Sequence, residues 1–314
     1  LISYTGSQKS SGLLIVQDGK IVSETYWPEK NYTDRTPRFQ RVVQGKDAYG
    51  SNVEDVASVQ KSIASLIVGI AQEKGFLSIK DPVTKYLGKG WSRATPEQEA
   101  KITVRHLITM TSGLMDDLTY EADAGTRWRY NTTAYGHSMH VAAKASGMSP
   151  QDMVAKWLTQ PLGLTDTEWG FRPGLEHADI KDQNVFGLST TNRDLARIGL
   201  MVLNGGKWED QTIIPDIKYL HDATHPSQEV NPSYGYLWWL NGQKTVRNGD
   251  GSQARKGPLI PEAPKDLFAA QGALGRKLYI VPSMNLVITR LGNQPPDRGF
   301  NDEFWKRLMA AAPR

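Results

Sequence analysis

The chain contains no cysteine, and this absence excludes several kinds of chemistry at once. Disulfides, thiolate metal sites and a cysteine nucleophile cannot occur. Long hydrophobic runs are missing as well, because the longest one, residues 66–71, is far shorter than the ~20 residues needed to cross a bilayer. The sequence therefore predicts no membrane span.

An excess of charge of one sign is also missing. The 37 Lys and Arg residues nearly balance the 33 Asp and Glu residues, and the basic residues are spread along the chain rather than gathered in a stripe. A nucleic-acid partner is therefore not expected. The chain has no Gly-x-Ser-x-Gly elbow, His-Glu-x-x-His pair or glycine-rich phosphate loop. His137 and His140 share a helix face without an obvious carboxylate partner, so we interpret them as packing or surface residues. We expect neither a metal nor a cofactor.

Strand patterns occupy the two ends of the chain. Residues 12–27 predict a hairpin about the turn Asp18-Gly19, and residues 28–57 predict an irregular connection. Near the other end, residues 234–240, 267–272, 276–281 and 285–291 predict strands, residues 241–266 a long loop, and residues 300–311 an amphipathic helix. An isolated hairpin is only marginally stable, so we expect the first strands to join the last ones in one antiparallel sheet.

Helical periodicity dominates the middle of the chain. Ile63, Leu66, Ile67 and Ile70 recur at helical spacing and Gly75 follows as a stop signal, so a helix is predicted to begin near Ser58. Residues 103–110, 133–146, 150–159 and 192–204 predict further helices. The predicted fold is α+β, with a sheet lobe of residues 1–57 and 230–314 and a mainly helical lobe of residues 58–229. A functional site is expected in the cleft between the lobes.

Ser58 and Lys61 are the first candidates for chemistry. Residues three apart on a helix lie on one face, so a hydroxyl and an amine can meet there. A serine becomes a nucleophile when a base takes its proton, and a lysine can be that base once burial lowers its pKa. Chance alone yields such a pair in a chain of this length. The alternative interpretation is a helix-capping serine followed by a solvated lysine.

Six segments, taken in order, resemble the serine β-lactamase and penicillin-binding-protein superfamily, above all its class C-like branch of esterases and 6-aminohexanoate-dimer hydrolases. The first is the Ser-x-x-Lys box, Ala-Ser-Val-Gln-Lys-Ser, and the third contains the sequence Tyr-Asn-Thr in place of a Tyr-x-Asn box. The segments are residues 57–62, 102–114, 125–136, 160–167, 189–197 and 272–275. The resemblance covers nearly the whole chain. It implies a β-lactamase/transpeptidase-like fold, an antiparallel sheet flanked by helices.

The resemblance also implies roles for particular residues. Ser58 would be the nucleophile that accepts the acyl group, Lys61 would draw its proton, and Tyr130 would pass a proton to the leaving group. The backbone N–H groups of Ser58 and Ala273 would form the oxyanion hole. Thr132, Gln271 and Gly272 would contact substrate. Tyr234 is a further candidate for substrate binding, as one of the aromatic residues near the predicted cleft that could line an apolar acyl pocket.

Two departures from the family pattern narrow the range of expected substrates. The Tyr-x-Asn box has Thr132 at its third position, so the two-ended hydrogen bonding of an amide is lost. The third box reads Ala270-Gln271-Gly272, without the cation and hydroxyl that hold the carboxylate of a β-lactam or stem peptide. An uncharged or weakly anionic acyl substrate is therefore expected.

The predicted function is a serine hydrolase that cleaves a small carboxylic ester or amide through an acyl-enzyme. Its expected partner is that small substrate, and the oligomeric state stays open. The alternatives are a β-lactamase, DD-peptidase or acyltransferase acting at the same serine, or a catalytically silent binding protein. The habits of the family favour a periplasmic or secreted location, with a cytoplasmic one as the alternative.

Overall fold

The strands from the two ends of the chain meet in one six-stranded antiparallel sheet. In the computed structural model, which describes residues 1–28, 43–172, 186–249 and 253–311, the strand order is β2-β1-β14-β13-β12-β9. The predicted joining of the N-terminal hairpin to the C-terminal strands is confirmed, since β1 pairs with β14. The strands are β1 (Ser10–Gln17), β2 (Lys20–Tyr26), β9 (Trp239–Leu240), β12 (Phe268–Gly272), β13 (Arg276–Val281) and β14 (Leu286–Gly292).

The hairpin turn follows from its two residues. Asp18 and Gly19 have φ values of 50° and 72°, the left-handed backbone that a two-residue type I′ turn requires. Asp and Gly adopt this conformation more readily than most residues. The predicted turn is therefore confirmed.

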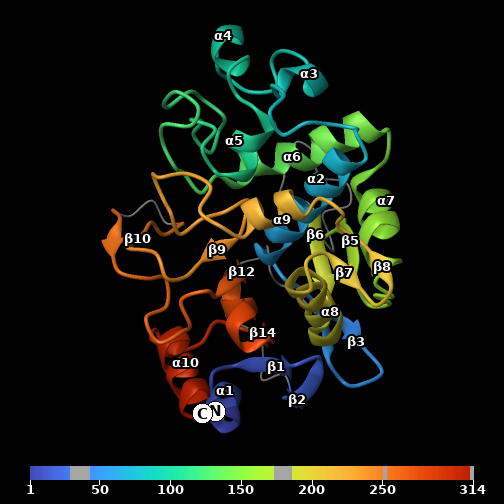
Figure 1. Cartoon of the computed structure of the whole chain (residues 1–314), viewed down its shortest axis with the longest axis vertical. Helices are drawn as coiled ribbons and strands as arrows, with labels where there is room; N and C mark the ends of the chain where they lie inside the picture. Colours follow the sequence, from blue (N-terminus) through green and yellow to red (C-terminus); the bar gives the residue numbers. More distant parts are fainter. Residues whose placement is uncertain (29–42, 173–185, 250–252, 312–314) are drawn as a thin grey trace.

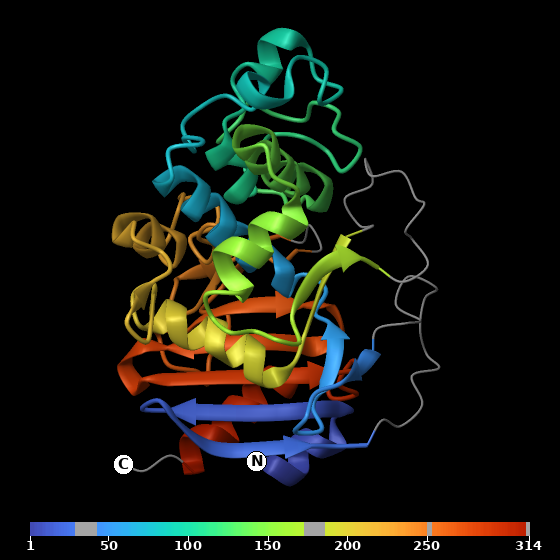
Figure 2. The same cartoon turned by 90° about the vertical axis from the view of Figure 1, so that its right-hand side faces the viewer.

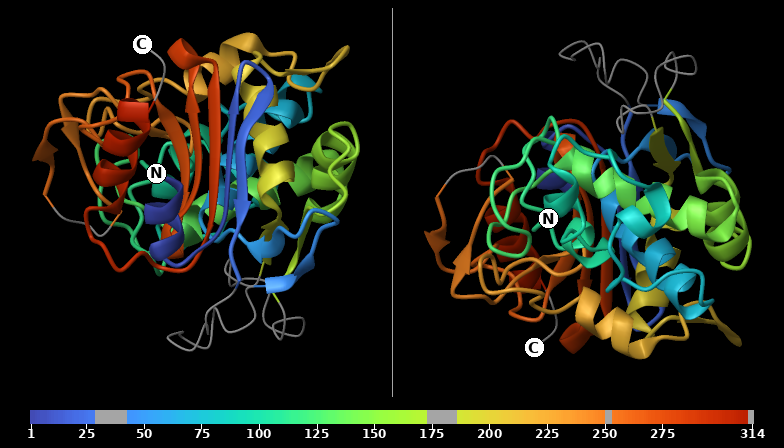
Figure 3. Two further views of the ribbon diagram at one scale, coloured as in Figure 1. Left: turned by 90° about the horizontal axis from the view of Figure 1, so that it is seen from below. Right: turned by 90° about the horizontal axis from the view of Figure 1, so that it is seen from above.

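Helices cover both faces of the large sheet. Leu14 and Val16 of β1 face one hydrophobic cluster while Leu13 and Ile15 face another, as alternation along a strand requires. On the first face lie α2 (Val59–Glu73) and α8 (Asn192–Leu203), and on the second lie α1 (Ile2–Ser7) and α10 (Phe300–Ala311). Figure 3 shows α1 and α10 side by side on one face and α8 on the opposite face. The predicted helix over residues 300–311 is confirmed.

The middle of the chain builds the helical region at the top of Figure 1. Its central element is α2, in which 13 of the 15 residues are buried. It packs against α6 (Thr132–Ser146) and α9 (Ile217–Ala223). The remaining helices are α3 (Thr84–Leu87), α4 (Pro96–Glu99), α5 (Val104–Ile108) and α7 (Pro150–Val154), which continues as a π-helical turn over Ala155–Thr159. Among the described residues the longest helices, α2 and α6, have 15 residues each, and none meets the length and apolarity of a bilayer span.

A second sheet corrects the expectation for the connection after the N-terminal hairpin. Its order is β3-β4-β6-β5, with β3 (Val43–Lys46), β4 (Asn52–Asp55), β5 (Glu168–Phe171) and β6 (Phe186–Thr190). The connection predicted over residues 28–57 is therefore not irregular throughout, and residues 29–42 of it lie outside the described residues. The polar composition of β4 was misleading, because Glu54 and Asp55 are buried in ion pairs rather than exposed in a loop. Figure 2 shows β3 and β4 of this sheet at one end of the strands of the large sheet.

Two predictions near the C-terminal strands also need correction. Only Trp239 and Leu240 of the strand predicted over residues 234–240 are extended, because Leu237, at φ 63°, turns the chain back so that Tyr234 pairs with Trp239. The loop predicted over residues 241–266 contains a small hairpin of β10 (Thr245–Val246) and β11 (Arg255–Lys256). Three short elements complete the chain: the hairpin of β7 (Lys207–Trp208) and β8 (Gln211–Thr212), and the 3-10 turns Ala273–Gly275 and Pro282–Met284.

The division into two lobes at residues 58 and 230 stays a prediction. Helix α8, which falls within residues 58–229, packs on β1, β13 and β14 of the large sheet. Gly199 of α8 allows the helix to lie close to β14, because a Cβ added there would lie 2.7 Å from Cγ1 of Val287. The chain returns to the sheet before the predicted boundary.

Candidate active site

Ser58 occupies the N-cap position of the buried helix α2, as its position in the sequence predicts. The preceding residue, Ala57, has a φ of 50°, an uncommon and costly conformation for a residue with a Cβ. The carboxylate of Asp55 holds this bend by accepting the Ala57 N–H at 2.8 Å. Asp55 is in turn paired with Arg172, whose Nε lies 2.5 Å from its Oδ2. A buried ion pair thus fixes the turn that presents Ser58.

Lys61 lies one turn along α2 and reaches back to Ser58. Its Nζ is 3.0 Å from Oγ of Ser58, a distance over which a proton can pass directly. The lysine side chain is buried, with only 3% of the residue exposed. Its Nζ also lies 5.0 Å from the centroid of the Tyr130 ring and 4.5 Å from that of Tyr135. The structure therefore excludes the solvated lysine of the alternative interpretation.

Tyr130 approaches the same hydroxyl from the segment that leads into α6. Asn131 anchors this segment: its side chain caps α6 by accepting the Ala134 N–H at 2.9 Å and donates to the carbonyls of Leu114 and Met115. Burial raises the pKa of Tyr130 above its ordinary value, although a hydrogen bond with Ser58 acts the other way. At neutral pH the phenol therefore keeps its proton and is able to donate it.

These residues open into one cavity of about 340 Å³. Ser58 and Tyr130 form one part of its wall, and Gln271, Gly272 and Ala273 at the end of β12 form another. The full lining is Ser58, Tyr130, Trp239, Asn248, Gly249, Leu259, Gln271, Gly272, Ala273 and Lys277. The cavity therefore brings the predicted nucleophile, phenol and oxyanion strand together.

The end of β12 lies directly against the start of α2. A Cβ added to Gly272 would be 2.3 Å from the carbonyl oxygen of Val56, so only glycine allows this approach. Outside the helices and strands, the backbone N–H groups of Ser58 and Ala273 donate to no other described residue. Both residues line the cavity, so their backbone N–H groups are candidates for the oxyanion hole that the family resemblance implies.

If Ala273 supplies an oxyanion donor, as the family resemblance implies, Gly272→Ala is expected to lower kcat by about 10²- to 10³-fold. The added methyl group would push Ala273 away from Ser58. Steady-state kinetics on a small ester measures the loss. Gly45→Ala is the control, since nothing lies within 4 Å of a Cβ at that position. Wild-type kcat in the Gly272 variant would contradict the role of this strand.

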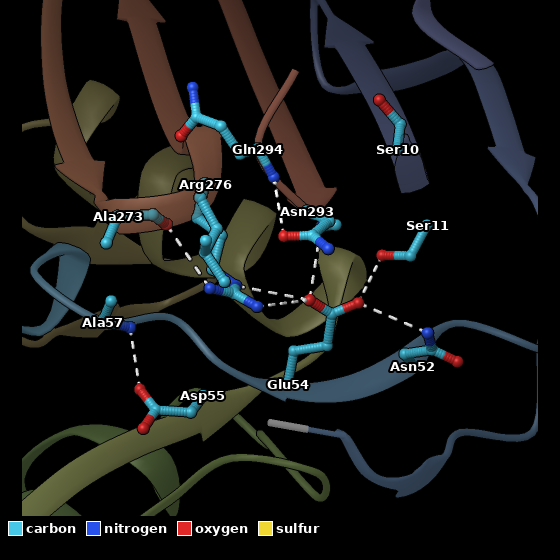
Figure 4. A network of polar contacts seen from close by, with 12 residues as sticks. Ser10, Ser11, Asn52, Glu54, Asp55, Ala57, Ala273, Arg276, Asn293 and Gln294 are labelled. Carbon is cyan, nitrogen blue, oxygen red and sulfur yellow. Dashed lines mark hydrogen bonds and ion pairs between the residues drawn. The ribbon is translucent and has the colours of Figure 1, made fainter. Parts of the chain in front are cut away.

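A second buried ion pair lies next to the turn that follows β12 (Figure 4). Glu54 of β4 and Arg276 of β13 are both fully buried, with Nη2 of the arginine 3.3 Å from Oε2 of the carboxylate. Arg276 also donates from Nη1 to the Ala273 carbonyl at 3.4 Å. Ser11 and the Gly292 N–H donate to the same carboxylate. The pair thus ties the turn that carries Ala273 to the strand that leads to Ser58.

Comparison with known proteins identifies the family. Residues 6–312, nearly the whole chain, match the protein family described as Beta-lactamase. The chain belongs to the β-lactamase family.

Relatives and solved structures agree with this assignment. An uncharacterized protein of Alkalihalophilus pseudofirmus is 26% identical over 93% of this chain and 86% of its own. A Bacillus anthracis protein described as a 6-aminohexanoate-dimer hydrolase has a TM-score of 0.73 at 17% identity, covering 99% of this chain and 81% of that one. A class C β-lactamase variant has a TM-score of 0.67 at 17% identity, covering 99% and 95%. The predicted family and its β-lactamase/transpeptidase-like fold are confirmed.

Only two of the four substrate-binding residues predicted from the sequence line the cavity. Gln271 and Gly272 line the cavity, whereas Thr132 and Tyr234 do not. Tyr234 is fully buried behind the wall, with its ring centroid 4.9 Å from that of Trp239 and 6.4 Å from that of Tyr130. Trp239 faces the cavity in its place. Tyr234 thus supports the two aromatic rings that form the wall.

His137 and His140 lie away from this cavity. Their ring centroids are 5.5 Å apart on α6, and burial lowers the pKa of His137 to about 4. Within the described ranges, no group of three histidine, aspartate or glutamate side chains is placed to hold a metal ion. Nothing about the pair distinguishes it from packing residues.

Sequence reasoning missed Lys277, Glu54 and Arg276. Lys277 lines the cavity from β13, and the signal available for it was a pair of cations, Arg276 and Lys277, opening a strand that is otherwise apolar. Glu54 carried no such signal, because it lies in a polar stretch and its partner is 222 residues away.

Proposed function

We propose that this β-lactamase-family serine hydrolase cleaves a small carboxylic ester or amide through an acyl-enzyme formed on Ser58. The observation that carries the proposal is the 3.0 Å contact between Nζ of Lys61 and Oγ of Ser58 inside a largely buried site. A buried amine beside a serine hydroxyl at the mouth of a cavity is the arrangement that activates a nucleophile.

The reaction begins with proton transfer from Ser58 to the neutral amine of Lys61. Oγ of Ser58 then forms a bond to the carbonyl carbon of the substrate, whose oxygen becomes negatively charged. The backbone N–H groups of Ser58 and Ala273 stabilise this oxyanion. Preorganised donors of this kind contribute about 3–4 kcal/mol each to lowering the barrier.

Tyr130 supplies the proton for the leaving group. Because its raised pKa keeps the phenol protonated at neutral pH, it can donate to the departing oxygen or nitrogen as the bond to the carbonyl carbon breaks. The proton held by Lys61 then restores the phenol. Water attacks the acyl-enzyme through the reverse sequence of proton transfers, releasing the acid and regenerating Ser58.

The lining of the cavity supports a small substrate without the β-lactam pattern. Ala270, at the strand position where penicillin-recognising enzymes carry a cation, is fully buried and apolar. Trp239 and Leu259 give the wall apolar surface, and a volume of about 340 Å³ suits a short acyl group. These features favour an ester or amide over a β-lactam or a stem peptide.

A panel of substrates tests whether esters are preferred over β-lactams. We expect wild-type protein to hydrolyse short-chain nitrophenyl esters faster than a chromogenic cephalosporin. Rapid cephalosporin hydrolysis with no turnover of the esters would overturn it and favour β-lactamase activity. A protein that neither hydrolyses these compounds nor reacts with a fluorophosphonate probe would be the catalytically silent alternative.

We expect Tyr130→Phe to lower kcat by about 10²- to 10³-fold, since a general acid typically contributes that much. The loss should be larger for an anilide than for a nitrophenyl ester, because a nitrophenolate departs without a proton. Stopped-assay kinetics with the two substrates measures the difference. Tyr135→Phe is the control: this buried tyrosine accepts a hydrogen bond from Gln60 and should affect stability more than leaving-group dependence. Equal losses on both substrates in Tyr130→Phe would contradict the assigned role.

A further inference from the structure

A buried lysine faces the same cavity as Ser58, from the strand next to the one that carries Gln271. Lys277 is the second residue of β13 and only 7% exposed, yet it lines the cavity together with Ser58, Tyr130 and Gln271. A long cationic side chain normally extends into water. An amine kept inside a substrate cavity is therefore a candidate for substrate recognition.

The contacts of Lys277 leave donors available. In the antiparallel pair β12–β13, Lys277 lies directly opposite Gln271, and its Nζ donates to the side-chain oxygen of that residue. An ammonium has three N–H donors, and in the described part of the chain no carboxylate forms an ion pair with this one. Burial, together with the positive charge of Arg290 on β14, lowers the pKa of Lys277 to about 7. A bound anion would raise this pKa and so keep the Lys277 amine protonated.

Gln271 adds a second donor from the neighbouring strand. Because an amine that carries its charge can only donate, the contact with Lys277 assigns the amide oxygen of Gln271 to that side. Its amide NH₂ makes no hydrogen bond to any described residue. The two side chains thus offer N–H donors from adjacent strands, and a carboxylate has two oxygens to accept them.

We infer that Lys277, held by Gln271, is a specificity-determining residue that binds a carboxylate group carried by the ester or amide substrate. The inference rests on the proposed function and sharpens it. A cation is absent at position 270 of β12, but the neighbouring strand supplies one beside the same cavity. The expected substrate is therefore anionic rather than neutral.

Two matched pairs of esters test the inference. The first pair places the carboxylate on the acyl group: mono-4-nitrophenyl adipate against neutral 4-nitrophenyl hexanoate. The second places it on the leaving group: 4-(butyryloxy)benzoate against its methyl ester. In each pair the ratio of kcat/KM for the anionic ester to that for the neutral one is measured in wild type and in Lys277→Met, which removes the charge at similar volume.

We expect Lys277→Met to lower this ratio about 10- to 100-fold in at least one pair, as loss of a buried charge-assisted hydrogen bond predicts. Gln271→Leu should lower the ratio in the same pair by a smaller factor. Lys256→Met, an exposed lysine on β11, should leave both ratios unchanged. The neutral ester also reports whether each variant is folded.

An unchanged ratio in both pairs for Lys277→Met, with Ser58-dependent hydrolysis still present, would overturn this inference and leave the proposed function standing. Wild-type protein that hydrolyses none of the four esters would overturn the proposed function, and this inference with it.

Discussion

Replacing Ser58 with alanine is expected to lower kcat/KM for ester hydrolysis by about 10⁴-fold or more. Removing a nucleophile abolishes the covalent route and leaves only the oxyanion donors and substrate binding. A loss of 10⁴ corresponds to about 5.5 kcal/mol of transition-state stabilisation. Initial rates at several substrate concentrations measure it, with melting temperature recorded in parallel to confirm that the variant is folded.

The matched control for this variant is Ser62→Ala, one turn further along α2. The hydroxyl of Ser62 donates to the Leu237 carbonyl at 2.6 Å in the buried core. Losing that bond should cost about 1–3 kcal/mol of stability because the carbonyl is left without its partner. Hydrolysis by the folded Ser62 variant should stay close to wild type. Comparable losses of activity in the two variants would show that the Ser58 effect is structural.

Lys61→Met should lower kcat by about 10³- to 10⁴-fold without a loss of stability. The methionine keeps the length of the side chain but cannot take the Ser58 proton, and a general base contributes about this much. Burying an amine costs free energy that an apolar side chain of similar volume does not. The melting temperature should therefore stay the same or rise while activity falls.

Lys74→Met is the control that tests whether the loss of kcat in Lys61→Met is specific to the position beside Ser58. Lys74 caps the other end of the same helix and is exposed, so its replacement should change neither kcat nor the melting temperature by much. A Lys61 variant that retains kcat within about threefold would show that another group takes the proton, against the expectation for general-base loss.

Sequence reasoning located what depends on local spacing. Ser58 and Lys61 are three residues apart on a helix, so their contact follows once the helix is recognised. Gly75, at φ 75°, ends that helix where the pattern indicated. Tyr130 lies 72 positions from Ser58, and no periodicity predicts their meeting; it was found through the resemblance of the surrounding motif to a known family.

What sequence reasoning missed depends on pairings between distant segments. Lys277 faces the cavity because the β12–β13 register places it opposite Gln271, which requires the turn between them to be known. Glu54 and Arg276 meet only after two sheets are brought together, and each looks like a surface residue in its own segment. Burial of these charges runs against composition, since Glu and Arg are usually exposed unless they are paired.

The most direct test of the account is the mass of the intact protein during turnover of a slow ester. Quenching in acid within the steady state should show one added acyl group, and peptide mapping should place it on Ser58, with no adduct in Ser58→Ala. Rapid hydrolysis with the acyl group on another residue, or with no adduct under conditions where deacylation is limiting, would contradict the claim that Ser58 is the nucleophile.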